Sequence, residues 1–114
     1  RREVLGDAWV DKSNKAQTEF NADWFDFIQR TAWGDIWSRP GLDRRTRSIV
    51  VLSSTISTRN WEEFKLHVRA CFNNGLTKDE IAEVITHLAF YSGWPASMTA
   101  ARVFKEVLDE RGMS

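Results

Sequence analysis

The segment from Thr77 to Leu88 constrains the fold of this chain most strongly. Thr77 is followed three residues later by Glu80, a spacing typical of a capping box, in which both side chains bind backbone amides at the start of a helix. The apolar residues that follow recur at i, i+3, i+4 and i+7, as Ile81, Val84, Ile85 and Leu88. That spacing predicts an α-helix with one apolar face, which must be buried against other elements.

Most other segments show helical periodicity between breaks. The breaks fall at Gly6, Gly34, Pro40–Gly41, Asn73–Gly75 and Gly93–Pro95. From about Thr18 to Trp33, a helix is predicted by the spacing of Phe20, Trp24, Phe27 and Ile28. Asn60 begins another helix, which Asn73, Asn74 and Gly75 end, because these residues accept the left-handed conformation of a C-cap. Pro95 suits the first turn of a last helix, with Met98, Ala101, Phe104 and Leu108 as its apolar residues.

The segment that runs from Asp43 through Ile49–Leu52 to Ile56 is ambiguous. Its β-branched residues would also suit a buried strand. No second strand candidate exists to pair with it, and a lone strand would leave its backbone donors and acceptors unsatisfied. We therefore predict a helix capped by Asp43, and an all-α single domain over residues 1–114 with about six helices.

Composition limits the classes of partner. Sixteen acidic residues balance sixteen Lys and Arg without a block of like charge, which argues against nucleic acid or an anionic membrane as the main partner. No apolar run approaches the roughly 20 residues of a membrane helix, no signal-peptide pattern is present, and one cysteine cannot form an internal disulfide. We expect a cytoplasmic protein with a small-molecule partner. A chain of this size leaves little room for a deep pocket, so a site near a subunit contact is expected.

The predicted helix after Asn60 carries the main candidate site. Glu63, His67 and Cys71 stand at i, i+4 and i+8, on one side of the helix and beside an apolar stripe. Glu63 can orient the imidazole of His67 and raise its proton affinity, as a general acid or base requires. Such pairs are also common on solvated helix faces, and that alternative stays open.

Two further groups compete for a chemical role. Glu83 and His87 repeat the same spacing, but dinuclear carboxylate bundles use Glu and His at i, i+3 with further Glu ligands, so no metal site is expected. His87 is near Tyr91 and is interpreted as a hydrogen-bonded structural residue. Cys71 has no partner cysteine and falls on the apolar stripe, so we expect a buried core residue and exclude a thiol mechanism.

Arginine and tryptophan residues are candidate ligand-binding groups. The arginines Arg39, Arg44, Arg45 and Arg47 flank a turn and a helix start, where one or two could bind a carboxylate in bidentate fashion. The tryptophans Trp33, Trp37, Trp61 and Trp94 lie at segment ends, where a ring can wall a cavity or anchor an interface. For most of these residues, solvation or packing is the expected role.

Four tracts together resemble 4-carboxymuconolactone decarboxylases: Ala32–Leu42, Arg44–Ser48, Asn60–His67 and His87–Ala96. The resemblance covers nearly the whole chain and includes the wider alkylhydroperoxidase-like superfamily. Members of that superfamily that reduce peroxides carry Cys-x-x-Cys-x-x-x-His. Here Asn60 and Glu63 occupy the two cysteine positions and His67 is retained. The resemblance therefore implies proton chemistry and not thiol redox chemistry.

The resemblance implies decarboxylation of 4-carboxymuconolactone, a dicarboxylate lactone, to 3-oxoadipate enol-lactone, in the protocatechuate branch of the β-ketoadipate pathway. It also implies a helical homo-oligomer, typically a hexamer, and no cofactor. In that reaction His67 would donate the proton, Glu63 would tune it, Arg47 with Arg39 would bind a carboxylate, and Trp33 would contact the substrate. The alternatives are a lactone hydrolase or isomerase on a related ring, and a non-catalytic binding protein with the same fold.

Overall fold

The computed structural model describes residues 1–15 and 18–114, and in these residues the regular structure is helical throughout. Seven α-helices occur in this part of the chain: α1 (Arg2–Leu5), α2 (Asp7–Lys15), α3 (Ala22–Ile28), α4 (Arg44–Ser57), α5 (Trp61–Asn73), α6 (Lys78–Tyr91) and α7 (Trp94–Glu110). A 3₁₀ turn, Glu19–Asn21, precedes α3, and a π-helix, Gln29–Ile36, follows it. The predicted all-α class is confirmed. None of the helices in the described ranges is both long and apolar enough to cross a membrane.

The predicted helix boundaries are confirmed where side-chain or glycine caps define them. The carboxylate of Asp43 accepts a hydrogen bond from the Thr46 amide at 2.7 Å, so the ambiguous segment is helix α4. Thr77 and Glu80 form the capping box, with N–H···O distances of 2.9 and 3.1 Å. Gly75 has φ +90° after α5, a left-handed conformation that ends this helix at low steric cost.

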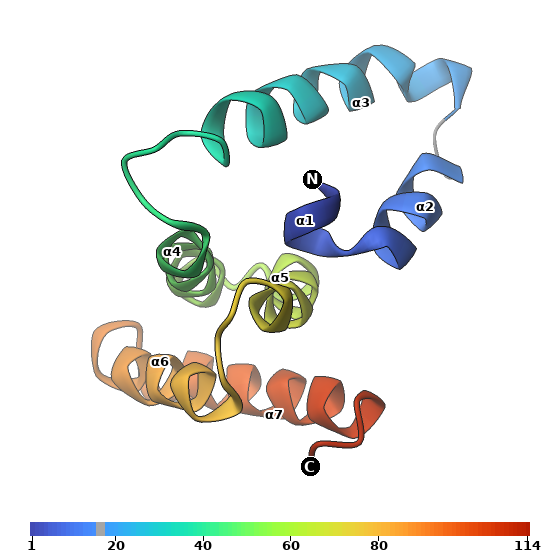
Figure 1. Ribbon diagram of the computed structural model, residues 1–114. Helices are drawn as coiled ribbons and strands as arrows, with labels where there is room; N and C mark the ends of the chain where they lie inside the picture. Colours follow the sequence, from blue (N-terminus) through green and yellow to red (C-terminus); the bar gives the residue numbers. More distant parts are fainter. Residues whose placement is uncertain (16–17) are drawn as a thin grey trace.

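Helices α4 to α7 build the main hydrophobic core. In Figure 1, α4 and α5 are seen almost end-on above the crossing pair α6 and α7. The largest fully buried side chains come from all four helices and include Leu52, Ile56, Phe64, Val68, Ile81 and Val107. The apolar face predicted for α6 is confirmed, because Ile81, Ile85 and Leu88 are buried and Val84 is partly buried.

The face predicted for α7 is partly wrong. Phe104 and Leu108 are buried as expected, but Met98 is 58% exposed and Ala101 is exposed. The buried face of α7 consists of Ala96, Ser97, Ala100, Val103, Phe104, Val107 and Leu108. These positions keep helical spacing, so two stripes compete on this helix, and packing against α5 and α6 decides which one is buried.

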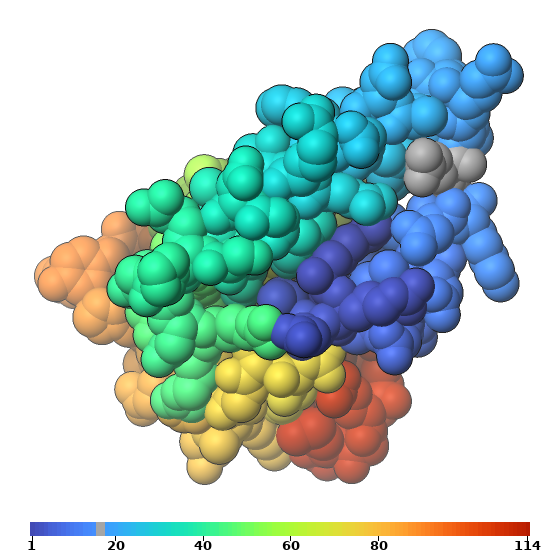
Figure 2. All heavy atoms as spheres, turned by 45° about the horizontal axis from the view of Figure 1, so that its top comes forward, coloured from blue at the N-terminus to red at the C-terminus, as the bar shows by residue number. Residues whose placement is uncertain are grey.

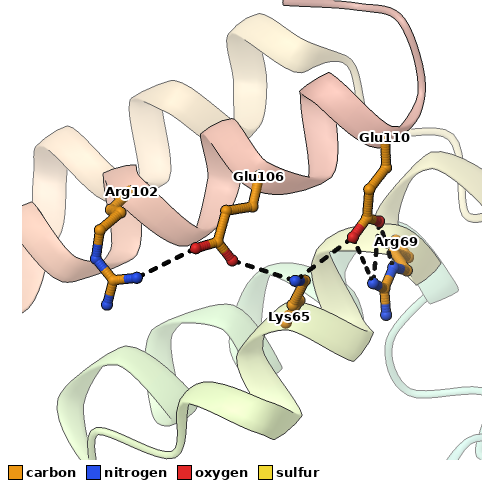
Figure 3. Close-up of polar contacts among 5 residues, drawn as sticks. All are labelled: Lys65, Arg69, Arg102, Glu106 and Glu110. Atoms are coloured by element: carbon orange, nitrogen blue, oxygen red, sulfur yellow. Dashed lines mark hydrogen bonds and ion pairs between the residues drawn. The ribbon is translucent and has the colours of Figure 1, made fainter.

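An ion-pair network joins α5 to α7 (Figure 3). Lys65 lies 3.1 Å from Glu106 and 3.4 Å from Glu110, and Arg69 binds the same Glu110 at 3.0 Å. Arg102 extends the network to Glu106 at 3.2 Å. Partly exposed pairs like these contribute little stability each, but together they specify how α5 is rotated against α7. The two basic residues of α5, Lys65 and Arg69, thus face α7.

The N-terminal segments form a second region above α5. Val4, Leu5 and Val10 pack with Ala70 of α5 in a separate small core. Helix α3 and the π-helix then arch over α1 and α2, and Figure 2 shows α3 (cyan) lying against these blue N-terminal helices. This arch is where the described chain departs from compact helix packing.

The predicted helix from Thr18 to Trp33 is wrong in its detail. Its first turn is 3₁₀, the α-helical part ends at Ile28, and the rest is π-helical, with the Trp37 amide bonded to the Ala32 carbonyl at 2.8 Å. The apolar side chains that predicted it are largely exposed, with Phe20 at 99%. The periodicity therefore marks an apolar face that the described part of the chain leaves largely exposed.

Candidate functional site

A cavity of about 360 Å³ lies between α5 and the N-terminal region. Its lining comes from three parts of the chain: Arg1, Leu5, Trp9, Lys12 and Ser13 from α1 and α2 with the residue before them, Trp24, Phe25, Ile28, Gln29 and Trp33 from α3 and the π-helix, and Glu63, Leu66 and His67 from α5. The volume falls in the range of about 300–1,000 Å³ found for small-molecule sites. Mostly apolar walls with a few polar groups are also typical of such sites.

The structure brings together three of the predicted site residues, Trp33, Glu63 and His67, as lining of this cavity. His67 is only 7% exposed. The Trp37 ring is parallel to the imidazole within 4°, with the ring centroids 6.1 Å apart. Trp33 stacks in turn on Trp37 at 5.7 Å, so the π-helix and the residue that caps its C-terminus supply a column of two indoles beside the imidazole. A π-helix often occurs at a functional site, and here it positions both rings.

Burial determines the protonation state of His67. Desolvation lowers the pKa of His67 from 6.5 to about 4. The sequence predicted the opposite direction, a pKa raised by Glu63. Glu63 does not outweigh burial, because its carboxylate oxygen is 3.8 Å from Nε2 and its side chain is 62% exposed to screening water. The neutral imidazole is therefore favoured at pH 7.

One ring nitrogen of His67, Nδ1, lacks a hydrogen-bond partner among the described residues. Nδ1 is buried and has no hydrogen-bond partner in residues 1–15 and 18–114. Leaving a buried polar atom unpaired costs about 1–3 kcal/mol. The imidazole of His67 therefore carries an unsatisfied buried polar atom in a residue that lines the cavity.

The two predicted carboxylate-binding arginines lie elsewhere. Arg47 lines a smaller cavity of about 110 Å³ with Ile36, Trp37, Leu42, Val50 and Val51, and its guanidinium donates to the Arg39 carbonyl at 2.8 Å. The Arg39 side chain is exposed. Because Trp37 contacts His67 and also lines the Arg47 cavity, it stands between these two groups. Arg44 and Arg45 form ion pairs with Glu3 and Glu80.

The cationic groups that do line the His67 cavity are Arg1 and Lys12, which the sequence analysis missed. No motif marks them, since they precede His67 by more than fifty residues. Packing of Val4 and Leu5 in the small core shared with α5 brings this part of the chain to the cavity. Only the apolar spacing of Val4, Leu5 and Val10 could have hinted at that contact.

The remaining candidates lie outside this cavity. The ring of His87 lies near that of Tyr91, as predicted, with the centroids 4.9 Å apart, but His87 is exposed and its side chain makes no hydrogen bond within residues 1–15 and 18–114. Glu83 and His87 line a separate depression between α4 and α6. Across the described ranges, no three His, Cys, Asp or Glu residues are grouped as a metal site would need. Cys71 is fully buried, as predicted, and burial raises its thiol pKa to about 12.

Comparison with known proteins connects this site to decarboxylases. Residues 22–106 match the carboxymuconolactone decarboxylase family. The chain is 46% identical over 114 residues to the 4-carboxymuconolactone decarboxylase of Acinetobacter baylyi. This alignment covers 100% of this chain and 85% of that protein. It is 37% identical over 110 residues to the nitrosuccinic acid decarboxylase of Metarhizium robertsii, and this alignment covers 96% of this chain and 77% of that protein. The family match extends from the start of α3 into α7 and includes Glu63 and His67.

Proposed function

The chain belongs to the carboxymuconolactone decarboxylase family, and on that premise we propose that it decarboxylates 4-carboxymuconolactone to 3-oxoadipate enol-lactone. This would place it in the protocatechuate branch of the β-ketoadipate pathway. The observation that carries the proposal is the buried imidazole of His67, whose Nδ1 has no partner in residues 1–15 and 18–114, in a residue that lines a cavity of small-molecule size. The relative from Acinetobacter baylyi supports the choice of substrate.

The reaction needs no electron sink beyond the substrate itself. The bond between the ring carbon and the leaving carboxylate breaks, and carbon dioxide departs. The electron pair moves through the conjugated ring to the lactone carbonyl oxygen, which gives a furan-like enolate. A proton then adds to ring carbon. The protein has to bind two anionic groups, keep the departing carboxylate poorly solvated, and deliver one proton.

We assign the proton delivery to His67. Its neutral form is favoured because burial lowers the pKa to about 4. A bound dicarboxylate brings negative charge to the imidazole, and a nearby opposite charge favours the protonated form. Substrate binding would therefore be coupled to proton uptake by His67. Glu63, at 3.8 Å from Nε2, would orient the ring and add to this effect when the cavity is closed to water.

The aromatic lining would keep the leaving carboxylate dry, with Trp33 contacting the substrate ring. The sequence also suggests Arg47, with Arg39, as the group that holds the carboxylate that remains. Arg47 lines a neighbouring cavity together with Trp37, and Trp37 stacks on His67, so a substrate bound by both Arg47 and His67 would have to extend past the Trp37 ring.

We also propose a homo-oligomer, a hexamer by family resemblance, with sites near subunit contacts. Exposed apolar side chains on the 3₁₀ turn and α3 and around the turn from α6 to α7 support this assembly: Phe20, Trp24, Phe27, Phe90, Tyr91, Trp94 and Met98. Large exposed apolar areas are typical of protein interfaces. Light scattering is expected to give an oligomer mass, and a monomer mass would contradict the proposal.

The function is tested by incubating the purified protein, without added metal or cofactor, with freshly prepared 4-carboxymuconolactone. Lactone absorbance and carbon dioxide release are followed together. Replacing His67 by Ala should lower turnover about a hundredfold or more, the scale of general acid catalysis. Unchanged turnover in this variant would remove His67 from the mechanism. Lactone loss without carbon dioxide would indicate a hydrolase or isomerase, and no reaction with an intact fold would favour a binding protein.

A second substrate class is favoured by the relative from Metarhizium robertsii. In nitrosuccinic acid the nitro group can accept the electron pair of the breaking bond, as the conjugated lactone carbonyl does in the first substrate. Both reactions leave one carboxylate on a stabilised carbanion that is then protonated. The same assay with nitrosuccinate alongside the lactone compares the two classes by kcat/KM.

A further inference from the structure

Two cations line the His67 cavity without a carboxylate partner. Arg1 donates its guanidinium hydrogens to the neutral oxygens of Ser13 and Asn14. Lys12 stands over the Trp9 ring, with Nζ 5.8 Å from the ring centroid. Neither forms an ion pair with a carboxylate anywhere in the described ranges 1–15 and 18–114, and Arg1 Nε is buried without a hydrogen-bond partner there.

The neighbouring Arg2 shows the contrast. It points its charge at two acidic residues, with Asp7 at 3.2 Å and Asp11 at 2.9 Å. Its charge is therefore already neutralised, and it does not line the cavity. Next to it along the chain, Arg1 keeps its charge uncompensated and lines the cavity. Asp7 and Asp11 thus form ion pairs with Arg2 and not with Arg1.

The cavity wall has the opposite charge to a dicarboxylate. Its single acidic residue is Glu63, against the two cations Arg1 and Lys12. The remaining lining is mostly aromatic or aliphatic, and a charge against such a wall is screened less than one in water. Burial, and to a smaller extent the neighbouring charge of Arg2, lowers the pKa of Arg1 from its usual value.

We propose that Arg1 and Lys12 form the anion-binding side of the His67 cavity and that they, in place of Arg47 and Arg39, bind the carboxylate that remains on a dicarboxylate substrate. The proposal rests on the proposed function for the identity of that substrate, while the binding site itself does not require decarboxylation. Ser13 and Asn14 accept hydrogen bonds from the two terminal nitrogens of the guanidinium and orient it, and the remaining N–H groups on these nitrogens and the positive charge can attract a carboxylate. Lys12 adds a mobile positive charge near the same wall.

The two cations would act on binding more than on chemistry. The carboxylate that remains carries its charge before, during and after loss of carbon dioxide. Groups that bind it equally in the ground and transition states change KM and leave kcat nearly unchanged. His67 acts on the proton that is delivered, so its replacement lowers kcat instead. The two kinds of residue are therefore separable by kinetics.

The test measures binding of furan-2,5-dicarboxylate, a flat ring diacid without a lactone, by tryptophan fluorescence and calorimetry. We expect saturable binding by the unaltered chain. Arg1→Gln should raise Kd roughly tenfold or more, since it removes a charge-assisted hydrogen bond, and Lys12→Gln should raise it to a smaller extent. The matched controls are Arg2→Gln and Lys15→Gln, which remove the same charges outside the cavity and should leave Kd unchanged.

Three results would overturn the proposal. The first is no saturable binding by the unaltered chain. The second is equal weakening by the control variants, which would indicate a general effect of net charge. The third is unchanged binding in Arg1→Gln and Lys12→Gln, with loss of binding in Arg47→Gln. Circular dichroism checks whether Arg1→Gln still folds. If it does not, Lys12→Gln still tests the proposal, because Lys12 is exposed and its replacement should not disturb packing. Diacid binding that depends on Arg1 and Lys12, without any release of carbon dioxide from the lactone, would instead leave this site standing and refute only the decarboxylase.

Discussion

The two regions of this molecule differ in what their apolar residues do. Helices α4 to α7 bury their apolar faces against one another, and the largest buried side chains belong to them. The N-terminal region from α1 to the π-helix forms a small core with α5 and leaves much of α3 exposed. The cavity with His67 lies where the two regions meet. Stability is thus concentrated in one region, and the other supplies most of the walls of the site.

The largest expected effect tests where stability resides. Phe64 on α5 is fully buried in the main core. Phe64→Ala should lower the free energy of unfolding by about 3–5 kcal/mol, because it leaves a cavity among packed side chains. Chemical denaturation monitored by circular dichroism measures it. Lys105→Ala, on an exposed position of α7, is the control and should stay within about 0.5 kcal/mol.

The second prediction concerns pH and the buried imidazole. The pKa of His67 is about 4 in the folded chain and 6.5 when exposed, so the unfolded state binds more protons between these values. Stability is therefore complete above about pH 6.5 and falls as the pH drops towards 4. By linkage the loss between pH 7.5 and 5 is about 2 kcal/mol. Denaturation of the unaltered chain and of His67→Gln at both pH values measures it, and equal losses in the two would refute it.

The third prediction addresses the indole that covers the imidazole. Trp37→Ala removes the ring that lies parallel to His67 and admits water. The pKa of His67 should rise towards 6.5, by about one unit or more, which corresponds to about 1.4 kcal/mol. Titration of the imidazole by NMR measures the shift. Trp37→Phe keeps an aromatic cover and should leave the pKa low, so a rise in both variants would argue against desolvation by this ring.

The smallest expected effect tests whether the regions can be separated. Asp43 caps α4 at the point where the chain enters the C-terminal region. Asp43→Ala should cost about 1 kcal/mol of stability, the usual value of a helix N-cap. Diacid binding at 25 °C should not change, because Asp43 does not line the His67 cavity. A large loss of binding in a folded variant would show that the two regions are coupled. Asp43→Asn retains a capping side chain and serves as the control.

Patterns within one helix were predicted well. The caps of Asp43 and Thr77 and the buried face of α6 follow from neighbours three or four residues apart, which local backbone geometry places together. Glu63 and His67 share a cavity for the same reason. The predicted face of α7 was wrong in part, because Met98 and Ala101 have the same helical spacing as the residues that are buried.

The sequence by itself determined the all-α class, most helix boundaries of the C-terminal region and the pairing of Glu63 with His67, since all of these depend on short-range geometry. Only the tertiary structure decided the direction of the His67 pKa, the separation of Arg47 from the cavity and the presence there of Arg1 and Lys12. These features depend on which distant segments exclude water from a side chain. Desolvation and charge proximity arise between elements far apart in the chain, and no local spacing encodes them.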